Sequence, residues 1–373
     1  MNSTGNITNN STNNQPTGRA FRIRPFRKTQ AEYEAIVALD KLVWPDTGDS
    51  VEDWQYRDEH RAPGRLYQRL VVEQDGQIIA FGAYQEPHWT YEPGKFFFDC
   101  RVHPAYLNQG VASAFYHYVL GNITARGAQI MTALTREDQP QAIEFLTSYG
   151  FEQVMRSPSS YLDVPAFDPA PFQDVLDRVA ADGIEVYSVA ELQKRDSDWM
   201  RKLWKLECAI DEDIPLPAPP THDSLQRYEE VYLNDPSFDP AAWVVAVDQG
   251  QYVALSALWI DLANSEQLYT HITGVARSHR RRGLAVALKL YGIAFAKRYG
   301  AKKIWTENEE HNPMFKLNLR LGFQPAPAWL DFRRELAEFM PDEEEVYTTA
   351  NRTTAAMAGH PVVAEHEMAI GDD

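Results

Sequence analysis

The sequence predicts a mixed α/β fold that occurs twice along the chain. Residues 268–300 follow the pattern of a strand, a glycine turn and a helix: an apolar, β-branched run precedes an Arg-Arg-Arg-Gly segment, and apolar residues at helical spacing follow it. The same order recurs around Gly110, 173 residues before Gly283. The glycines of two Gly-Phe pairs, Gly150 and Gly322, are 172 residues apart. Two landmarks with nearly the same offset predict a tandem duplication.

Composition restricts the class of protein. At 373 residues with 44% hydrophobic residues, the chain has the length and apolar content of two ordinary globular domains. The net charge of −17 argues against nucleic acid or an anionic membrane as the main partner. Cys100 and Cys208 are too few for a disulfide framework and stand in no metal-binding spacing. No apolar run could span a membrane and no apolar leader is present, so we expect a cytoplasmic chain.

The first copy is expected over residues 19–165. A tail of low-complexity Asn, Ser and Thr precedes it (1–18), and its composition predicts disorder. An Asp-Gly pair at 75–76, between two β-rich runs, predicts a hairpin. The expected strands are 21–24, 70–73, 78–84, 96–102 and 130–134, and the expected helices are 31–42, one that ends near 125, and 142–148.

A second copy is expected over residues 184–339, after a linker (166–183) rich in Pro, Asp and Ala. Its main helix should run from 284 to a C-cap at Gly300. A proline-rich segment at 215–220 should be stiff and extended. The acidic and polar tail at 340–373 is expected to be an appendage. The expected strands of this copy are 184–187, 243–247, 252–261, 268–276 and 304–306.

The turn at 280–283 has the chemistry of an anion site. A glycine turn ahead of a helix directs free backbone N–H groups and the helix N-terminus at one place, which suits a phosphate. Arg280, Arg281 and Arg282 add positive charge there. An arginine run also occurs in nucleic-acid patches. The acidic balance of the chain and the position between strand and helix favour a phosphate-bearing small molecule instead.

The segment 280–285 (Arg-x-x-Gly-x-Ala) resembles the signature of the GNAT superfamily of acyl-CoA N-acyltransferases. The segment 308–323, which contains Asn308 and Asn312 and ends in Gly-Phe, resembles that family's second block. The repeated arrangement is similar to two-copy, mycothiol-synthase-like acetyltransferases. The resemblance implies two tandem domains, each with a central mixed, mostly antiparallel sheet flanked by helices. It also implies direct transfer of the acetyl group of acetyl-CoA to a primary amine of a small molecule, with no metal.

The resemblance also implies which residues bind the coenzyme. A backbone N–H near Val275 would hold the thioester carbonyl, the glycine turn would hold the pyrophosphate, and Asn312 would hold the pantetheine arm. The expected coenzyme-binding residues are Val275, Ala276, Arg277, Arg280, Arg281, Arg282, Gly283, Leu284, Ala285, Asn308, Asn312 and Phe315.

The second copy is the better equipped of the two, so catalysis is expected there. Where the family has Arg or Gln three residues before the glycine, the first copy has Leu107. Where the second copy has Asn312, the first has Pro140, which has no side-chain donor and no N–H. The first copy keeps Gln-Gly-Val-Ala at 109–112, which leaves coenzyme binding there open. Its expected role is a scaffold that shapes the acceptor cleft or an interface.

His271 is the expected general base. Family members often carry a Glu six residues before the valine, where this chain has Tyr269, and a phenol with an ordinary pKa of about 10 is a poor base at neutral pH. His271 is two residues further on, hence on the same face of the strand, and imidazole has an ordinary pKa of about 6.5. We expect Tyr269 to orient the substrate. The alternative is that both are ordinary residues of the cleft wall.

The acid that protonates the departing thiolate is missing from the pattern. Family members often use a Tyr four residues before Gly322, where this chain has Asn318. An amide donates a hydrogen bond but supplies no proton. Either water protonates the thiolate or the coenzyme leaves as a thiolate.

Two other functions stay open: a non-catalytic acyl-CoA-binding or regulatory protein, and an acyltransferase with another acyl donor. The acidic run Asp211, Glu212 and Asp213 either binds a cationic amine or forms a solvated helix end, and the second interpretation is favoured. The resemblance is compatible with a homodimer, although no motif in the sequence supports one.

Overall fold

The computed structural model describes residues 21–45 and 49–336. Both expected tails and the segment 46–48 lie outside these residues. The strands are β1 (Arg22–Pro25), β2 (Tyr67–Gln74), β3 (Gln77–Gln85), β4 (Lys95–Val102), β5 (Ile130–Arg136), β6 (Glu152–Asp163), β7 (Glu185–Ser188), β8 (Phe238–Asp248), β9 (Gln251–Ile260), β10 (Gln267–Val275), β11 (Lys303–Glu307) and β12 (Gln324–Glu335). The helices are α1 (Gln30–Val43), α2 (Val51–Glu59), α3 (Val111–Thr124), α4 (Pro140–Ser148), α5 (Gln173–Ala181), α6 (Val189–Arg195), α7 (Trp199–Asp211), α8 (Leu225–Tyr228), α9 (Leu284–Tyr299) and α10 (Pro313–Arg320).

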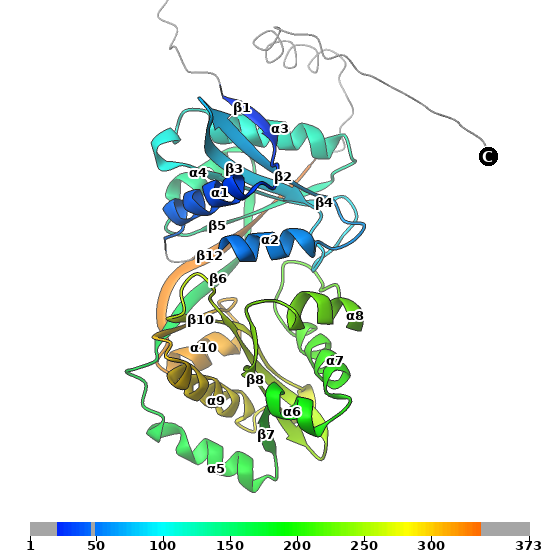
Figure 1. Ribbon diagram of the computed structural model, residues 1–373, viewed down its shortest axis with the longest axis vertical. Coiled ribbons are helices and arrows are strands. Elements are labelled where there is room, and N and C mark those ends of the chain that lie inside the picture. The colour runs from blue at the N-terminus through cyan, green and yellow to red at the C-terminus, as the bar shows by residue number, and fades with distance from the viewer. Residues whose placement is uncertain (1–20, 46–48, 337–373) are drawn as a thin grey trace, which may run out of the picture. The chain divides into compact units, whose positions relative to one another are not determined.

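The strands of the described residues form one mixed sheet in the order β1-β2-β3-β4-β5-β12-β6-β11-β10-β9-β8-β7. The pairs β4–β5 and β10–β11 are parallel. The other neighbouring pairs in this part of the chain are antiparallel. Helices flank the sheet, as Figure 1 shows. The predicted fold class, a mixed and mostly antiparallel sheet flanked by helices, is confirmed.

The two copies are joined by an exchange of their last strands. β12, the last strand of the second copy, lies between β5 and β6 of the first. β6 pairs in turn with β11 of the second copy. The exchange places residues of the first copy beside the strands that carry the expected site.

β10 and β11 separate soon after they begin. Their pairing ends at Tyr269 and Trp305, and β10 then continues to Val275 alongside β9. The register with β9 shifts at His271, which marks a β-bulge, a feature that re-aims a side chain. In the first copy β4 likewise leaves β5 after Phe97. Each copy therefore contains a wedge-shaped gap between two parallel strands.

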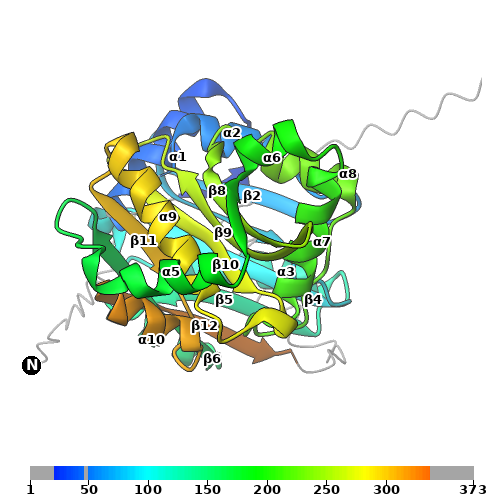
Figure 2. The same ribbon diagram turned by 90° about the horizontal axis from the view of Figure 1, so that it is seen from below.

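α7 and α9 pack on opposite faces of the sheet. Successive side chains of a strand point to opposite faces. On β9, the side chain of Leu258 faces α9, since a β-carbon added to Gly292 of that helix would contact it. The next residue, Trp259, packs its ring 5.0 Å from that of His271, which bonds to α7. Figures 1 and 2 both place strands of the second copy between these two helices.

Most of the expected elements are confirmed to within a few residues. Gly300 ends α9 with φ of 92°, the left-handed conformation that the C-cap requires. The predictions include neither the long strands β6 and β12 nor bounds for the helices α2, α5, α6, α7, α8 and α10. Both strands contain prolines, which weaken the sequence pattern of a strand. Across the described part of the chain, no helix combines the length and apolar character needed to cross a bilayer.

Candidate active site

The loop between β10 and α9 presents free backbone N–H groups at the start of a helix. Arg281 (φ 64°) and Gly283 (φ 87°) adopt the left-handed conformation, which glycine enters freely and arginine does not. The N–H groups of residues 281–286 donate to no acceptor in the described part of the chain. Together they form a concavity suited to an anion.

Carboxylates hold three of the loop's arginines in place. Asp213 accepts a hydrogen bond from Arg277 (Nη2 to Oδ1, 2.6 Å) and also pairs with Arg280. Arg282 pairs with Asp182, just beyond α5, at 3.0 Å. These pairs fix the loop before a ligand arrives, which lowers the cost of ordering it on binding.

The acidic end of α7 matches the expected solvated helix end only in part, since Glu212 is exposed whereas Asp211 and Asp213 are partly buried. Asp213 holds the loop, and the Arg277 guanidinium keeps the pKa of this carboxyl below its usual value. Asp211 lines a cavity beside His271, where burial and the nearby Glu207 raise its pKa to about 6. By contrast, Arg281 is exposed and has no ion pair or hydrogen bond with a described residue.

A cleft of about 490 Å³ opens where β10 and β11 part. The N–H of Ala276 donates to Val253 on β9 (2.8 Å). Backbone N–H groups alternate in direction along a strand, so those of Val275 and Thr273 point to the opposite edge, into the gap that β11 leaves. The residues contributed by the first copy to the cleft wall are Trp89, Leu134, Met155 and Ser157.

The expected residues of the second block lie around α10, but not all reach the cleft. Asn308 and Asn312 line it. Asn312 also caps α10, since its Oδ1 accepts from the N–H of Met314 at 2.9 Å. Asn318 is fully buried and donates from Nδ2 to Asn308 Oδ1 at 2.6 Å. Neither Asn318 nor the half-buried Phe315 lines the cleft.

His271 reaches from β10 to a buried carboxylate. Its Nε2 lies 2.7 Å from Glu207 Oε1 on α7, and the other oxygen of Glu207 accepts a hydrogen bond from the Tyr228 hydroxyl at 2.5 Å. The imidazole stacks on Trp243 with centroids 5.2 Å apart. A carboxylate fixed in this way can orient an imidazole and stabilise its cation. The described residues offer no hydrogen-bond partner to Nδ1 of His271.

Sequence reasoning missed Glu207 as a functional residue. A buried carboxylate is costly unless it is paired, and Glu207 is 5% exposed. The signal that could have found it is an acidic residue next to an apolar helical stripe. The buried apolar residues of α7 are Leu203, Leu206 and Ile210.

Tyr269 and His271 line a common space of about 300 Å³ with Thr306 and Trp329. Burial, and then the neighbouring carboxylate of Asp261, raise the pKa of Tyr269 above its ordinary value. The phenol therefore stays protonated at neutral pH and can donate a hydrogen bond but cannot act as a base.

A further cavity of about 260 Å³ adjoins His271 on the α7 side. Aromatic rings combined with carboxylates suit an organic cation. A loop of the first copy closes one side, since the N–H of Thr221 donates to the carbonyl of Trp89 at 2.8 Å. The aromatic and acidic residues that line the cavity are Trp89, Trp204, Tyr228, Tyr232, Glu207, Asp211 and Asp223.

The first copy keeps the loop but fills the gap. Asn108 (φ 60°) and Gly110 (φ 79°) repeat the left-handed pair, and no described acceptor binds the N–H groups of residues 108–113. No arginine stands at 107–112. Phe98, the first residue of β4 beyond the pairing, is buried with its ring 5.9 Å from Tyr116 and 6.4 Å from Phe151. Pro140 begins α4 where the second copy has Asn312.

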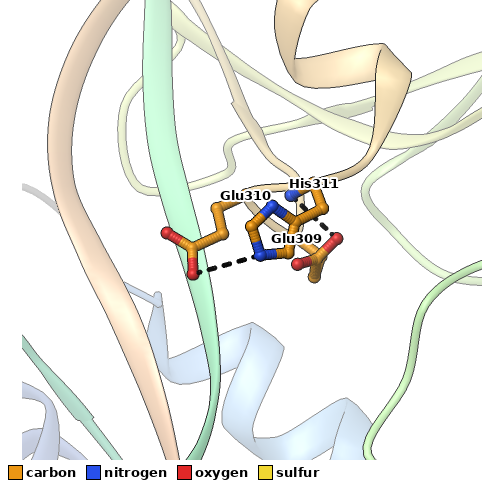
Figure 3. A group of neighbouring side chains, drawn as sticks. All are labelled: Glu309, Glu310 and His311. Atoms are coloured by element: carbon orange, nitrogen blue, oxygen red, sulfur yellow. Dashed lines mark hydrogen bonds and ion pairs between the residues drawn. The ribbon is translucent and has the colours of Figure 1, made fainter.

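Figure 3 shows Glu309, Glu310 and His311, three side chains with metal-ligand atoms close together in the loop before α10. Each carboxylate already has a partner. Glu309 accepts from the N–H of His311 at 3.0 Å, and Glu310 pairs with Arg156 at 3.3 Å. Exposed acidic groups of this kind are common without a metal, so the group carries no assignment.

The parted parallel strands, the glycine turn and the helix after it define the fold of an acyl-CoA-dependent transferase, present in two copies, and the gap between the strands is open in the second copy. The model of the acetyltransferase (GNAT) family matches residues 33–151 and 206–323. The chain therefore belongs to the GNAT acetyltransferase family and carries two tandem family domains. Membership supports acetyl transfer as its general chemistry. A search of curated proteins gave no match.

Solved structures share this architecture. A GCN5-related N-acetyltransferase from Sphaerobacter thermophilus is 18% identical, with a TM-score of 0.62 over 84% of this chain and 95% of that one. A tandem GNAT protein from the clavulanic acid biosynthesis pathway is also 18% identical, with a TM-score of 0.65 over 85% and 98%. The glucosamine N-acetyltransferase region of a fungal multi-domain β-N-acetylglucosaminidase is 13% identical, with a TM-score of 0.63 over 86% and 38%. At these identities the likeness concerns the fold alone.

Proposed function

We propose that the second copy transfers the acetyl group of acetyl-CoA directly to a primary amine of a small molecule. The observation that carries the proposal is the cleft between β10 and β11, which joins a cationic glycine turn to the hydrogen-bonded pair of His271 and Glu207. The first copy serves as a scaffold whose residues complete the wall of that cleft.

The free backbone N–H groups of the loop at 281–286 and of β10 bind the coenzyme. The pyrophosphate lies on the N–H groups of 281–286, with the exposed Arg281 beside it. The pantetheine arm extends along β10 in the gap that β11 leaves, next to Asn308 and Asn312. The N–H groups of Thr273 and Val275 then hold the thioester carbonyl and the negative charge that develops on it.

The amine attacks from the α7 side. With Nε2–H directed at Glu207, the Nδ1 of His271 is the basic nitrogen and accepts the proton of the attacking amine, directly or through water. Glu207 stabilises the imidazolium that forms, and the Tyr269 hydroxyl orients the acceptor. Asn318 acts as a positioning residue, because it is buried and reaches the cleft through Asn308.

The acceptor fits the cavity that adjoins His271. An amine is positively charged before it loses its proton, and the carboxylates of Glu207, Asp211 and Asp223 attract such a cation. The rings of Trp204 and Tyr232 provide apolar contact for the body of the molecule. A small amine with an apolar or aromatic part is therefore the preferred class.

Calorimetric titration with acetyl-CoA tests the coenzyme site. Gly283→Glu is compared with Gly110→Glu, since each glycine is the left-handed N-cap of the corresponding helix. A β-carbon at 283 would also lie 2.9 Å from Val175 Cγ1, whereas one at 110 would meet no atom within 4 Å, so Gly283→Ala is the control for the steric effect without the charge. Backbone strain of about 1–2 kcal/mol is common to both, whereas a carboxylate within about 4 Å of a phosphate costs about 1–4 kcal/mol. We expect one site per chain that weakens at least about tenfold in Gly283→Glu and survives in Gly110→Glu. The reverse pattern would place the coenzyme in the first copy.

Release of free thiol with a panel of primary amines tests catalysis. His271→Ala should lower kcat by about 100-fold or more if the imidazole is the base. A variant with the wild-type rate and pH profile would refute that role. Binding without turnover of any amine would favour an acyl-CoA-binding protein, and turnover with another acyl-CoA alone would favour a different donor.

A further inference from the structure

Lys289, in the second turn of α9, is a buried cation with no counter-charge among the residues that the structure describes. The residue is 6% exposed, and no hydrogen bond or ion pair joins its side chain to a described residue. Its Nζ lies 5.3 Å from the centroid of the Phe323 ring. A buried ammonium without an anion is costly, so its retention calls for a function.

The ammonium faces the coenzyme cleft. Lys289 lines the 490 Å³ cleft together with Thr273 and Thr306, and it also lines a small space of about 10 Å³ at the end of the gap. The charged and titratable groups that share the cleft are Glu307, Glu309, Asp331 and His271, none of which is bonded to Lys289.

Lys289 and His271 approach the gap from opposite sides. His271 is held by α7 and Lys289 extends from α9, and these helices cover opposite faces of the sheet. In acyl transfer the amine adds to one face of the thioester carbonyl carbon, and the coenzyme A thiolate then leaves that carbon. A base on one side of the sheet and an acid on the other match these two needs.

Asn318, whose amide supplies no proton, stands on α10 where the family resemblance implies a tyrosine. It is fully buried and bonds to Asn308. The first copy differs at the position of Lys289: Tyr116 stands there, fully buried, and its hydroxyl accepts a hydrogen bond from Arg334. The free ammonium is thus specific to the copy whose cleft is open.

We propose that Lys289 is the general acid that protonates the coenzyme A thiolate, an inference that rests on the proposed function. The amine adds to the thioester, the C–S bond breaks, and its electron pair goes to sulfur. The ammonium gives one proton to the thiolate and becomes a neutral amine, which regains a proton from water. Burial lowers the pKa of Lys289 to about 8, which is below that of a cysteine thiol, about 8.5, so proton transfer from the ammonium to the thiolate is not uphill.

The test measures the ionisation of bound coenzyme A and needs no acceptor. Free coenzyme A is titrated with pH in saturating wild-type protein, and the thiolate is followed by its ultraviolet absorbance, with desulfo-coenzyme A as the blank. Because an adjacent ammonium favours the thiolate, the bound thiol should ionise at least about one pH unit lower than free coenzyme A. In Lys289→Met, which keeps the side-chain volume, it should ionise at or above the value of free coenzyme A.

Lys316→Met is the matched control, since it removes an exposed lysine from α10, and it should behave as wild type. Equal ionisation of the bound thiol in wild type and Lys289→Met would overturn the proposal. Acetylation of Lys289 on incubation with acetyl-CoA, seen by peptide mass, would overturn it as well, because the side chain would then be an acceptor. Failure of both coenzyme A and its desulfo analogue to bind the wild type would instead refute the proposed function itself.

Discussion

Replacing Asp331 by Asn should stabilise the protein at neutral pH. Asp331 on β12 lines the cleft, and its side chain has no ion pair or hydrogen bond with a described residue. Burial raises its pKa from 3.8 to about 6. This change in pKa corresponds to a cost of about 3 kcal/mol for ionising the group in the folded state. Because the side chain is partly exposed to solvent, the expected gain is about 1–2 kcal/mol.

The sign of the pH dependence follows from the direction of the shift. The folded state holds the proton of Asp331 more tightly than the unfolded state does, so the folded state is favoured by protonation. The cost is absent below pH 3.8, grows as the pH rises to about 6, and is complete above that. Asp331→Asn should therefore exceed wild type in stability at pH 8 and equal it near pH 4.

Urea unfolding of the ligand-free protein at both pH values measures the difference. Asp198→Asn is the matched control, since the side chain of Asp198 is 55% exposed and pairs with Arg201 on the surface. Its effect should stay within about 0.5 kcal/mol at either pH. A variant of Asp331 that is no more stable than wild type at pH 8, or whose advantage persists at pH 4, would refute the reasoning. A confirmed gain would mean that stability is given up at the cleft to keep a carboxylate there.

Other substitutions test the packing and polar contacts of the site. Gly274→Ala should destabilise the fold by about 1–3 kcal/mol, because a β-carbon there would overlap Ile210 of α7; urea unfolding measures this, and Ile210→Val in the same chain should recover part of the loss. Asn318→Leu should leave stability within about 1 kcal/mol of wild type, since it also removes a buried amide oxygen without a described partner. It should weaken acetyl-CoA binding severalfold in calorimetry, because Asn308 loses its donor; unchanged affinity would remove Asn318 from the site. Glu207→Gln should lower kcat by about 10–100-fold with little change in acetyl-CoA affinity, and loss of affinity instead would show a structural role.

The sequence by itself determined the features that depend on short stretches of backbone. The duplication is visible because two landmarks recur at offsets of 173 and 172 residues. The turn at Gly283 and the C-cap at Gly300 were predictable because left-handed backbone excludes most side chains. The hairpin between β2 and β3 and the family signature are local in the same sense.

The tertiary structure alone decided which side chains meet. Glu207 precedes His271 by 64 residues, and the two meet only because α7 packs on β10 at the bulge. In the sequence Lys289 has the pattern of an ordinary polar residue of a helix. In the fold it is a buried cation beside the gap between β10 and β11. The exchange of β6 and β12 was equally hidden, since strand pairing depends on the register of distant segments rather than on local propensity. Contacts between elements determine which residues are buried, which side chains pair and how the strands are ordered. Periodicity and turn chemistry in the sequence carry no information about these contacts.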